Sequence, residues 1–481
     1  MTGFRKAVLV FLVLSLPCSS RAKQGEGTKF LLPFAELEKK GVEISVYAEL
    51  EGEKVVSFRA DLPMNPASVT KIFTAALALH VLGADFACET RIFHRKTSQG
   101  QHEIFVKGCG DPMLESKDIE ELAKCVTEKG IKKISSVALD LGPFTEEKMP
   151  PGYDQKDTTA PYRAFISGFQ VDYNRFVVRV KPASFGKPPD VAISPESDYI
   201  VVENKAVSVK KGQDGNKNRA DAQIKVAEKG GKLLVSVEGK VSKAMERGFA
   251  VFDPALFTMG ALTRALRSQG ALVEKAKVFL STVPEDADPL CSHRSKPLSE
   301  MVKTMLKESQ NQVAETLARL AAYALKKHPV GFGDAVEALS MFLKNVAHLD
   351  PRSFQIRNAS GLYDSNRITA KETVKFLDFV LAHDEYRPLV AGLPVAGRDG
   401  TLKSRLKKTP LEGKVFAKTG TLDNVRALAG IMQCGDKGLL KFAVFAQSKG
   451  KLQGPAVRDA TDKFLLRVFK ERCEEEASPH P

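Results

Sequence analysis

The chain of 481 residues contains no tryptophan, so it lacks the ring most used as a stacking platform for nucleic-acid bases, and no nucleic-acid fold motif is present. After residue 22 it has no apolar run long enough to span a bilayer. No cysteine and histidine residues have the spacing of metal ligands, because Cys291 and His293 stand isolated. The sequence therefore predicts neither nucleic acid as a partner, nor a metal, nor any other cofactor.

Acidic residues are fewer than basic ones, 58 against 72, which gives a net charge of +14 and a pI near 9.3. Such a charge favours an anionic working surface, such as a cell-wall polymer or the outer face of a membrane. The length and an apolar content of 43% predict two or three domains with conventional cores.

The first 22 residues are predicted to be a secretory signal peptide, because Arg5 and Lys6 precede an apolar run over residues 7–16. Cleavage is expected after Ser20 or Ala22. Pro17 makes lipid modification of Cys18 a poor fit. The mature protein is thus expected in the periplasm or another extracytoplasmic compartment.

An exported chain can form disulfides, and the six remaining cysteines allow fifteen complete pairings. The sequence does not choose among them, and several cysteines could be buried thiols. A bond between Cys434 and Cys473 would tie the last helix to its sheet.

Three short motifs carry the chemistry: Ser68-Val69-Thr70-Lys71, Ser309-Gln310-Asn311 and Lys418-Thr419-Gly420. The first pattern is weak by itself, since Ser-x-x-Lys recurs at Ser20, Ser184, Ser208, Ser404 and Ser448. Only Ser68 is followed by a long apolar segment, residues 72–82, which predicts a buried helix that begins at the serine.

On such a helix Lys71 lies on the same face as Ser68, and its amine can take the proton of the hydroxyl. A lysine acts as a base only when its charged form is disfavoured, by burial and by a second cation. Lys418 is the candidate for that cation. A strand is expected at residues 414–418, with Gly420 allowing a substrate backbone to approach.

Ser309 and Asn311 fall between two predicted helices, residues 298–308 and 313–324. There they could relay a proton and hold a substrate amide. Taken singly, Ser-Gln-Asn could be a helix cap and Lys-Thr-Gly the end of a strand. Together and in this order, the three motifs predict a serine acyl-enzyme that uses lysine as its base.

The chain resembles the D-alanyl-D-alanine carboxypeptidases and endopeptidases of the class C, low-molecular-mass penicillin-binding proteins. The resemblance covers nearly the whole mature chain and includes, besides the motifs, residues 82–86, 108–112, 171–174, 360–362 with Asn366, and 393–402. It implies that Ser68 is the nucleophile, Lys71 the general base and Ser309 the proton relay to the leaving group. The same resemblance assigns the other site residues: Asn311 to the acyl-side amide, Lys418 and Thr419 to the terminal carboxylate, and the backbone N–H groups of Ser68 and Thr421 to the oxyanion hole.

Departures from the family pattern concern the substrate. Asp364 follows the 360–362 segment where relatives often place serine and arginine, and Asp423 lies after the Lys-Thr-Gly strand. We hypothesise that these acids, with Asp157 and Tyr162, bind the free amino group of a diaminopimelate or lysine side chain. Relatives have an acid and an aromatic ring at the last two positions. Asp364 and Asp423 could equally be solvated or capping acids.

The predicted fold is α/β (α+β): a β-lactamase/transpeptidase-like catalytic domain with a large α/β insert that carries a small β-rich module. The expected boundaries are 29–83 and 289–474 for the catalytic domain, 84–181 and 251–288 for the insert, and 182–250 for the nested module.

The predicted function is a penicillin-sensitive, serine-type D-Ala-D-Ala carboxypeptidase or D,D-endopeptidase. Its partners would be peptidoglycan stem peptides, and β-lactam antibiotics would inhibit it covalently. Both activities cleave beside a D-amino acid, so the sequence leaves the choice between them open. Two alternatives remain: a serine β-lactamase, which would leave the insert unexplained, and a non-catalytic cell-wall binding protein.

Overall fold

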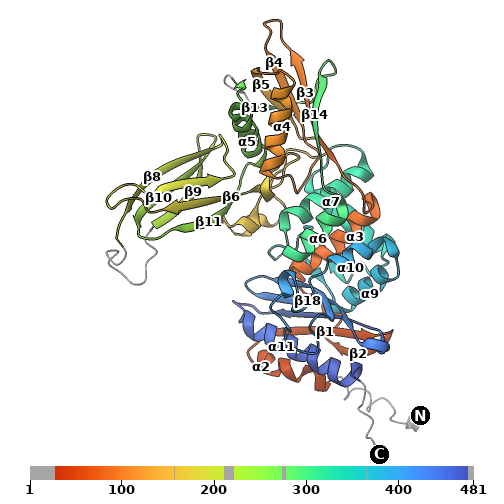
Figure 1. The fold of residues 1–481 in the computed structure, drawn as a ribbon. Coiled ribbons are helices and arrows are strands. Elements are labelled where there is room, and N and C mark those ends of the chain that lie inside the picture. Colours follow the sequence, from red (N-terminus) through yellow and green to blue (C-terminus); the bar gives the residue numbers. More distant parts are fainter. Residues whose placement is uncertain (1–27, 157, 211–221, 274–277, 365, 475–481) are drawn as a thin grey trace, which may run out of the picture.

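The computed structural model of the chain describes residues 28–156, 158–210, 222–273, 278–364 and 366–474. The expected signal peptide with Cys18, and the candidate site residue Asp157, lie outside the described residues. Figure 1 shows a sheet and its helices at one end, a second sheet at the other end, and a β-rich part that projects sideways between them.

The first sheet has the strand order β17-β18-β19-β1-β2 and is antiparallel throughout. Both of its faces are covered, because alternate residues of β19 belong to different hydrophobic cores. Ala443 and Phe445 pack in one core, whereas Phe442 and Val444 pack in the other. The strands are β1 (Glu43–Leu50), β2 (Glu53–Phe58), β17 (Val415–Thr421), β18 (Val425–Gln433) and β19 (Leu439–Gln447).

One face of this sheet is covered by α11 (Gly454–Val468) and by the N-terminal segment Thr28–Phe34 with α2 (Ala35–Lys39). A group of helices covers the other face and forms the middle layer of Figure 1. These are α3 (Thr70–Leu82), α6 (Leu298–Glu308), α7 (Asn311–Lys326), α8 (Phe332–Met341), α9 (Ala370–Leu381) and α10 (Arg387–Gly392), with a small pair of strands, β15 (Phe354–Gln355) and β16 (Arg367–Ile368).

The second sheet has the order β12-β5-β4-β3-β14, with β13 also paired to β5. Helices α4 (Ser116–Glu128) and α5 (Pro254–Ser268) pack against each other beside it. The strands are β3 (Glu89–Lys96), β4 (His102–Lys107), β5 (Lys133–Asp140), β12 (Leu272–Val273), β13 (Val278–Leu280) and β14 (Asp288–Arg294).

The projecting part contains two three-stranded sheets, β11-β6-β7 and β8-β10-β9. Its strands are β6 (Arg175–Lys181), β7 (Asp190–Ser194), β8 (Ile200–Ser208), β9 (Ala222–Lys229), β10 (Lys232–Val241) and β11 (Met245–Ala250).

Two expected domain boundaries fall inside these sheets. Strand β6 ends at residue 181, just before the expected start of the nested module, yet it pairs with β7 and β11 of that module. Strand β14 contains residue 289, where the catalytic domain was expected to resume, yet it pairs with β3 of the insert. We propose that the boundaries lie near residues 174 and 294 instead, because a sheet is held by hydrogen bonds between strands distant in sequence.

The described cysteines form three disulfides, Cys88–Cys109, Cys125–Cys291 and Cys434–Cys473. The last joins the end of β18 to the residues that follow α11, so the pairing expected to tie the last helix to its sheet is confirmed. The second joins α4 to β14 within the insert.

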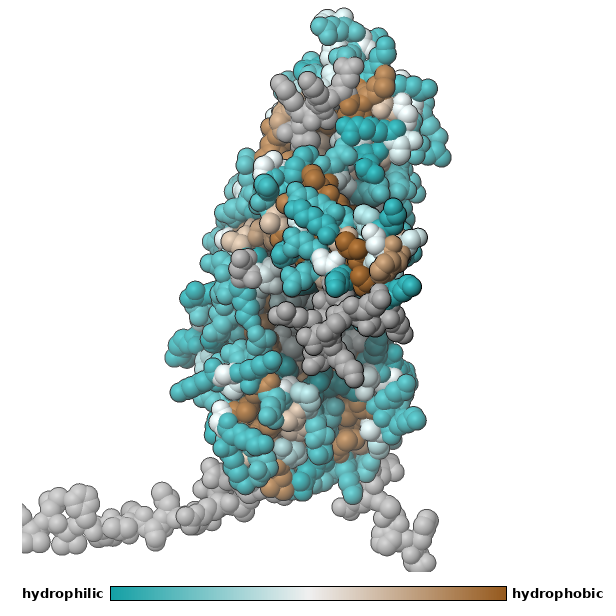
Figure 2. All heavy atoms as spheres, turned by 90° about the vertical axis from the view of Figure 1, so that its left-hand side faces the viewer, coloured by the Kyte–Doolittle hydropathy of each residue, from teal (hydrophilic) through white to brown (hydrophobic). Residues whose placement is uncertain are grey.

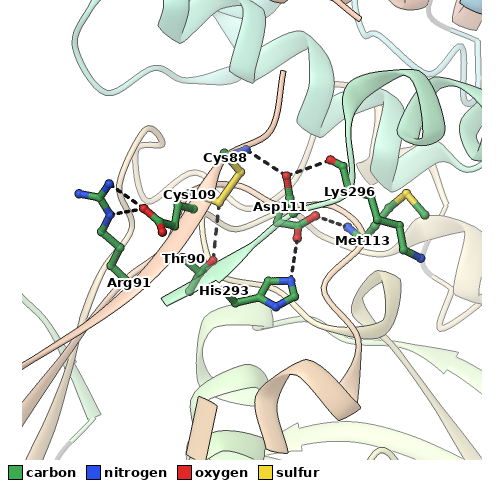
Figure 3. Close-up of a disulfide and its surroundings, with 10 residues drawn as sticks. Cys88, Thr90, Arg91, Cys109, Asp111, Met113, His293 and Lys296 are labelled. Atoms are coloured by element: carbon green, nitrogen blue, oxygen red, sulfur yellow. Dashed lines mark hydrogen bonds and ion pairs between the residues drawn. A yellow bond between two sulfur atoms is a disulfide. The ribbon is translucent and has the colours of Figure 1, made fainter. Parts of the chain in front are cut away.

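The Cys88–Cys109 disulfide lies where the chain passes between the helical layer and the insert (Figure 3). The outgoing and returning segments run side by side there, since Cys88 N donates to Ser295 Oγ at 3.0 Å and Ser295 N donates to Cys88 O at 2.9 Å. The returning segment continues directly into α6, which Ser309 follows. The disulfide therefore lies beside the connection that leads to Ser309.

Asp111 lies beside this disulfide and is only 3% exposed (Figure 3). Its Oδ1 accepts a hydrogen bond of 2.8 Å from Met113 N, and its Oδ2 is 3.9 Å from His293 Nε2. Burial raises the pKa of Asp111 to about 6.

The face of the molecule in Figure 2 is mainly hydrophilic, with hydrophobic side chains in small separate groups. Within residues 28–474, apart from the gaps, every helix is too short or too polar to pass through a lipid bilayer.

Candidate active site

Ser68 lies in a short 3₁₀ turn, Ala67–Val69, and α3 begins two residues later at Thr70. The helix was expected to begin at the serine itself. Asn65 holds this turn, because its Oδ1 accepts a hydrogen bond of 2.8 Å from Ala67 N. Ala67 has a φ of 46°, a strained value for a residue with a Cβ. The turn leaves Ser68 half-buried at the floor of the cleft while the helix behind it is buried.

Lys71 is fully buried, and its Nζ contacts three oxygen atoms. They are Ser68 Oγ at 3.0 Å, Asn311 Oδ1 at 2.7 Å and the carbonyl oxygen of Ser360 at 2.6 Å. The amide oxygen and the carbonyl oxygen can only accept. A neutral amine has two N–H groups for these two acceptors and one lone pair, which is left to face the hydroxyl of Ser68.

Both lysines of the motifs are buried, and among the described residues no carboxylate forms an ion pair with either of them. Burial lowers the pKa of Lys71 well below its ordinary value, the charge of Lys418 lowers it further, and Glu315 partly opposes the shift. Burial lowers the pKa of Lys418 to about 7. Burial therefore favours the neutral form of Lys71, the form that can accept a proton, and Lys418, with a pKa of about 7, is partly charged at neutral pH.

Ser309 and Lys418 form the other side of the site. Lys418 Nζ donates to Ser309 Oγ and to the carbonyl oxygen of Thr419, both at 2.9 Å. Ser309 ends α6 with a φ of 60°, where glycine is usual, so its side chain is held at the helix junction at a cost in strain. The structure thus places Ser309 between α6 and α7, as expected.

Asn311 is the first residue of α7 and is oriented from two sides. Its Nδ2 donates to the carbonyl oxygen of Tyr162 at 2.9 Å, which turns its Oδ1 toward Lys71. One turn along the same helix, Glu315 is buried and accepts from the backbone N–H groups of Ala359 and Ser360, at 3.2 and 2.9 Å. Glu315 thereby holds the segment whose carbonyl contacts Lys71.

Residues 358–362 pack tightly against the Ala67–Val69 turn. A Cβ on Gly361 would lie 1.9 Å from the carbonyl oxygen of Ala67, and its φ is +74°. Tyr153, fully buried and from the insert, lies with its hydroxyl 3.0 Å from Ser360 Oγ. Burial raises the pKa of Tyr153 well above its ordinary value, so it stays neutral.

Gly420 has a different neighbour from the one expected. A Cβ there would lie 2.5 Å from the carbonyl oxygen of Pro66 and 2.8 Å from the Cβ of Ala427. The glycine therefore allows β17 to approach the turn that contains Ser68, and its expected role toward a substrate stays a prediction. On the same strand, Thr419 and Thr421 line the cleft.

The cleft has a volume of about 510 Å³ and brings motif residues and other candidates together. Its lining includes Ser68, Ser309, Asn311, Tyr162, Asp364 and Asp423. The side chain of Tyr162 is 51% exposed there.

The two acids of the cleft already have cationic partners. Arg367 Nη1 is 2.7 Å from Asp364 Oδ1, and Lys156 pairs with Asp423. These partners lower the pKa of both carboxyl groups. An incoming ammonium group would have to compete with them.

Four further residues at the site were not predicted: Asn65, Tyr153, Lys156 and Glu315. The sequence held a signal for Glu315, which is spaced four residues from Asn311 and so shares its helix face. Tyr153 and Lys156 come from the insert, and no local pattern indicates that this segment returns to the cleft.

A model of the D-Ala-D-Ala carboxypeptidase 3 (S13) family matches residues 29–468. The chain belongs to this family. It is similar to a D-alanyl-D-alanine carboxypeptidase from an Actinomadura species, with 30% identity over 444 residues, which cover 87% of this chain and 79% of the relative.

Solved structures agree with this membership. The crystal structure of penicillin-binding protein 4 from Haemophilus influenzae matches with a TM-score of 0.78 and 25% identity, covering 92% of this chain and 99% of that one. The same Haemophilus protein in complex with a β-lactam matches with a TM-score of 0.73 and 24% identity, covering 93% and 98%. The predicted fold class, a transpeptidase-like domain with a large insert, is confirmed. The chain is a serine-type hydrolase of the D-Ala-D-Ala carboxypeptidase class.

Proposed function

We propose that the protein cleaves D-alanyl peptides of peptidoglycan through an acyl-enzyme on Ser68. The observation that carries this proposal is the environment of Lys71, whose two acceptors leave only a lone pair for the serine hydroxyl. Lys71 takes the proton of Ser68 as Oγ attacks the carbonyl carbon that precedes the terminal D-residue.

The remaining residues bind the substrate, protonate its leaving group and stabilise the negative charge that develops on the attacked carbonyl oxygen. The backbone N–H groups of Ser68 and Thr421 bind the oxyanion, and Asn311 holds the acyl-side amide. Ser309 passes a proton to the leaving amine and recovers one from Lys418, 2.9 Å away. Lys418 and Thr419 bind the terminal carboxylate. Water then hydrolyses the acyl-enzyme.

β-Lactams are proposed as covalent inhibitors, since they mimic the acyl donor and the Haemophilus protein has been solved with one. An oxidising, extracytoplasmic location is supported by three disulfides and by the signal-like first 22 residues.

For the third residue of the stem peptide, we propose that Asp157 and Tyr162 bind the side-chain ammonium group. Asp364 and Asp423 are weaker candidates, because each already pairs with a cation. Asp157→Asn should slow hydrolysis of a diaminopimelate peptide, and an unchanged rate would remove this assignment.

The test of the nucleophile is the intact mass of the mature protein after incubation with benzylpenicillin. Wild type should gain the mass of one penicillin, and Ser68→Ala should gain none. Ser184→Ala is the matched control, because Ser184 also precedes a lysine by three residues but is exposed in the projecting part. It should be acylated as wild type is.

The lifetime of the penicillin adduct distinguishes a penicillin-binding protein from a β-lactamase and from a non-catalytic protein. A long-lived adduct is expected of a penicillin-binding protein, whereas an adduct lost within seconds would favour a β-lactamase. No adduct at any time on folded wild type would contradict the proposal and favour a non-catalytic wall-binding protein.

A further inference from the structure

A second pocket, of about 280 Å³, lies beside the catalytic cleft between β17, β18, the start of α11 and the segment around residue 401. Its lining is rich in hydroxyl groups and contains three arginines: Arg405, Arg426 and Arg458. Thr419 and Thr421 belong to both the cleft and this pocket, whereas the three arginines have no role in the mechanism proposed above.

Two of these arginines form no ion pair among the described residues, although the charge of Asp423 acts on Arg426 and partly opposes the fall of its pKa. Arg405 binds Asp462, with Nη2 at 2.5 Å from Oδ1. In the described part of the chain no carboxylate lies within ion-pair distance of Arg426 or Arg458, and Asp423 is taken by Lys156. Burial lowers the pKa of Arg426, and the like charge of Arg458 lowers it further. Two repelling guanidinium groups in one pocket favour an anion between them.

The surrounding backbone holds Arg426 in this position. Its Nη1 donates to the carbonyl oxygen of Val425 at 2.7 Å. A Cβ on Gly454, the first residue of α11, would lie 2.3 Å from Arg426 Nη2, so the guanidinium packs directly against the start of this helix. The first turn of α11 also contains no acidic residue.

The pocket is continuous with the cleft, because Thr401, Thr419, Thr421 and Arg426 line both. Thr419 Oγ1 donates to Thr401 Oγ1 at 2.8 Å across the boundary between them. Ser68 lines only the cleft. The pocket therefore lies beyond the residue that binds the terminal carboxylate in the proposed mechanism, on the side of the leaving group.

We propose that Arg426 and Arg458 form a subsite for a second carboxylate on the leaving group. A terminal D-alanine has one carboxylate, and the motif residues already bind it. In a cross-linked substrate the leaving amine belongs to another stem peptide, which carries additional carboxylates. The subsite would therefore favour cleavage of cross-links, a preference that rests on the proposed function.

The experiment compares three peptides with one acyl side, Nα-acetyl-L-Lys-D-Ala-X, in which the lysine keeps its free side-chain amino group and X is D-Ala, D-Glu or D-Gln. D-Glu and D-Gln differ only in the second carboxylate, so the ratio of their kcat/KM values cancels effects common to both. The variants are Arg458→Gln and the double variant Arg426→Gln/Arg458→Gln. Lys463→Gln is the matched control, since it removes one exposed positive charge from the same helix.

In wild type the kcat/KM for the D-Glu peptide should exceed that for the D-Gln peptide by about tenfold or more, as expected for a bidentate, charge-assisted contact. Arg458→Gln should reduce this ratio several-fold, and the double variant should bring it to about 1. Lys463→Gln should keep the wild-type ratio.

A ratio of about 1 in wild type, or one that survives in the double variant, would overturn the subsite. Acylation by benzylpenicillin is measured on the same preparations. Wild type that is acylated but shows no preference refutes the subsite alone, whereas wild type that is not acylated refutes the proposed function as well.

Discussion

Replacing Lys418 by methionine should make the protein inactive yet more stable at neutral and mildly acidic pH. Lys418 is 0% exposed and has no carboxylate partner among the described residues. Its side chain is held in the site although its charge is poorly solvated. Methionine has a similar shape and no charge, so it fills the same space without the electrostatic cost.

The magnitude follows from the pKa of Lys418, which burial lowers from 10.5 to about 7. Each pKa unit corresponds to about 1.4 kcal/mol, so keeping this group charged in the fold costs about 5 kcal/mol at pH 6. The variant also loses the hydrogen bonds to Ser309 and to the carbonyl of Thr419, about 1 kcal/mol each. The expected net gain at pH 6 is about 3 kcal/mol.

The stability difference between Lys418→Met and wild type should depend on pH. Between pH 7 and pH 10.5 the unfolded lysine holds a proton that the folded lysine has released, so wild-type stability rises with pH in this window. The advantage of Lys418→Met should shrink by about 4 kcal/mol between pH 6 and pH 10, and then vanish or change sign.

The assay is urea unfolding followed by circular dichroism at both pH values. Lys54→Met, which replaces an exposed lysine on β2, is the control and should show no comparable dependence on pH. A Lys418→Met protein that is less stable than wild type at pH 6, or whose difference from wild type is the same at both pH values, would refute the reasoning.

Three further predictions concern Glu315, Gly361 and Asp111. Glu315→Gln removes the negative charge that supports the protonated form of Lys71, so the rising acid limb of the pH profile for β-lactam acylation should move to lower pH; an unmoved limb would contradict this. Gly361→Ala should reduce acylation at least about tenfold, measured by intact mass against time, because its Cβ would lie 1.9 Å from the Ala67 carbonyl oxygen. Asp111→Asn should stabilise the protein by up to about 3 kcal/mol at pH 8 and hardly at all below pH 4, because burial raises the pKa of the carboxyl to about 6 and the folded state loses stability as pH rises through that range. Equal urea midpoints for wild type and Asp111→Asn at pH 8 would argue against it.

Features with a local sequence signature were predictable. Ser68 and Lys71 are three residues apart on one helical face, and the apolar run after them predicted the helix. The strands around Lys418 and the helices on either side of Ser309 followed from periodicity alone. Ser68, Ser309 and Asn311 line one cleft in the structure, and Lys71 and Lys418 lie buried behind them at hydrogen-bond distance.

Features that depend on pairing between distant segments were not predictable. The expected domain boundaries cut off β6 and β14 because the sequence does not show which strand each one joins. The partner of Asp423 is Lys156, about 270 residues away, so an acid that looked free for a substrate is already paired. The close approach at Gly420 likewise depends on a turn that lies more than 350 residues earlier in the chain.

The insert is part of the active site. The carbonyl of Tyr162 orients the amide of Asn311, and the hydroxyl of Tyr153 contacts Ser360, so residues of the insert position two of the three oxygen-bearing groups around Lys71. Burial is the largest influence on the pKa of Lys71. Because burial favours the neutral form of a lysine, the proposed mechanism gives the insert a part in the chemistry, since its residues help to enclose a lysine that lies outside it.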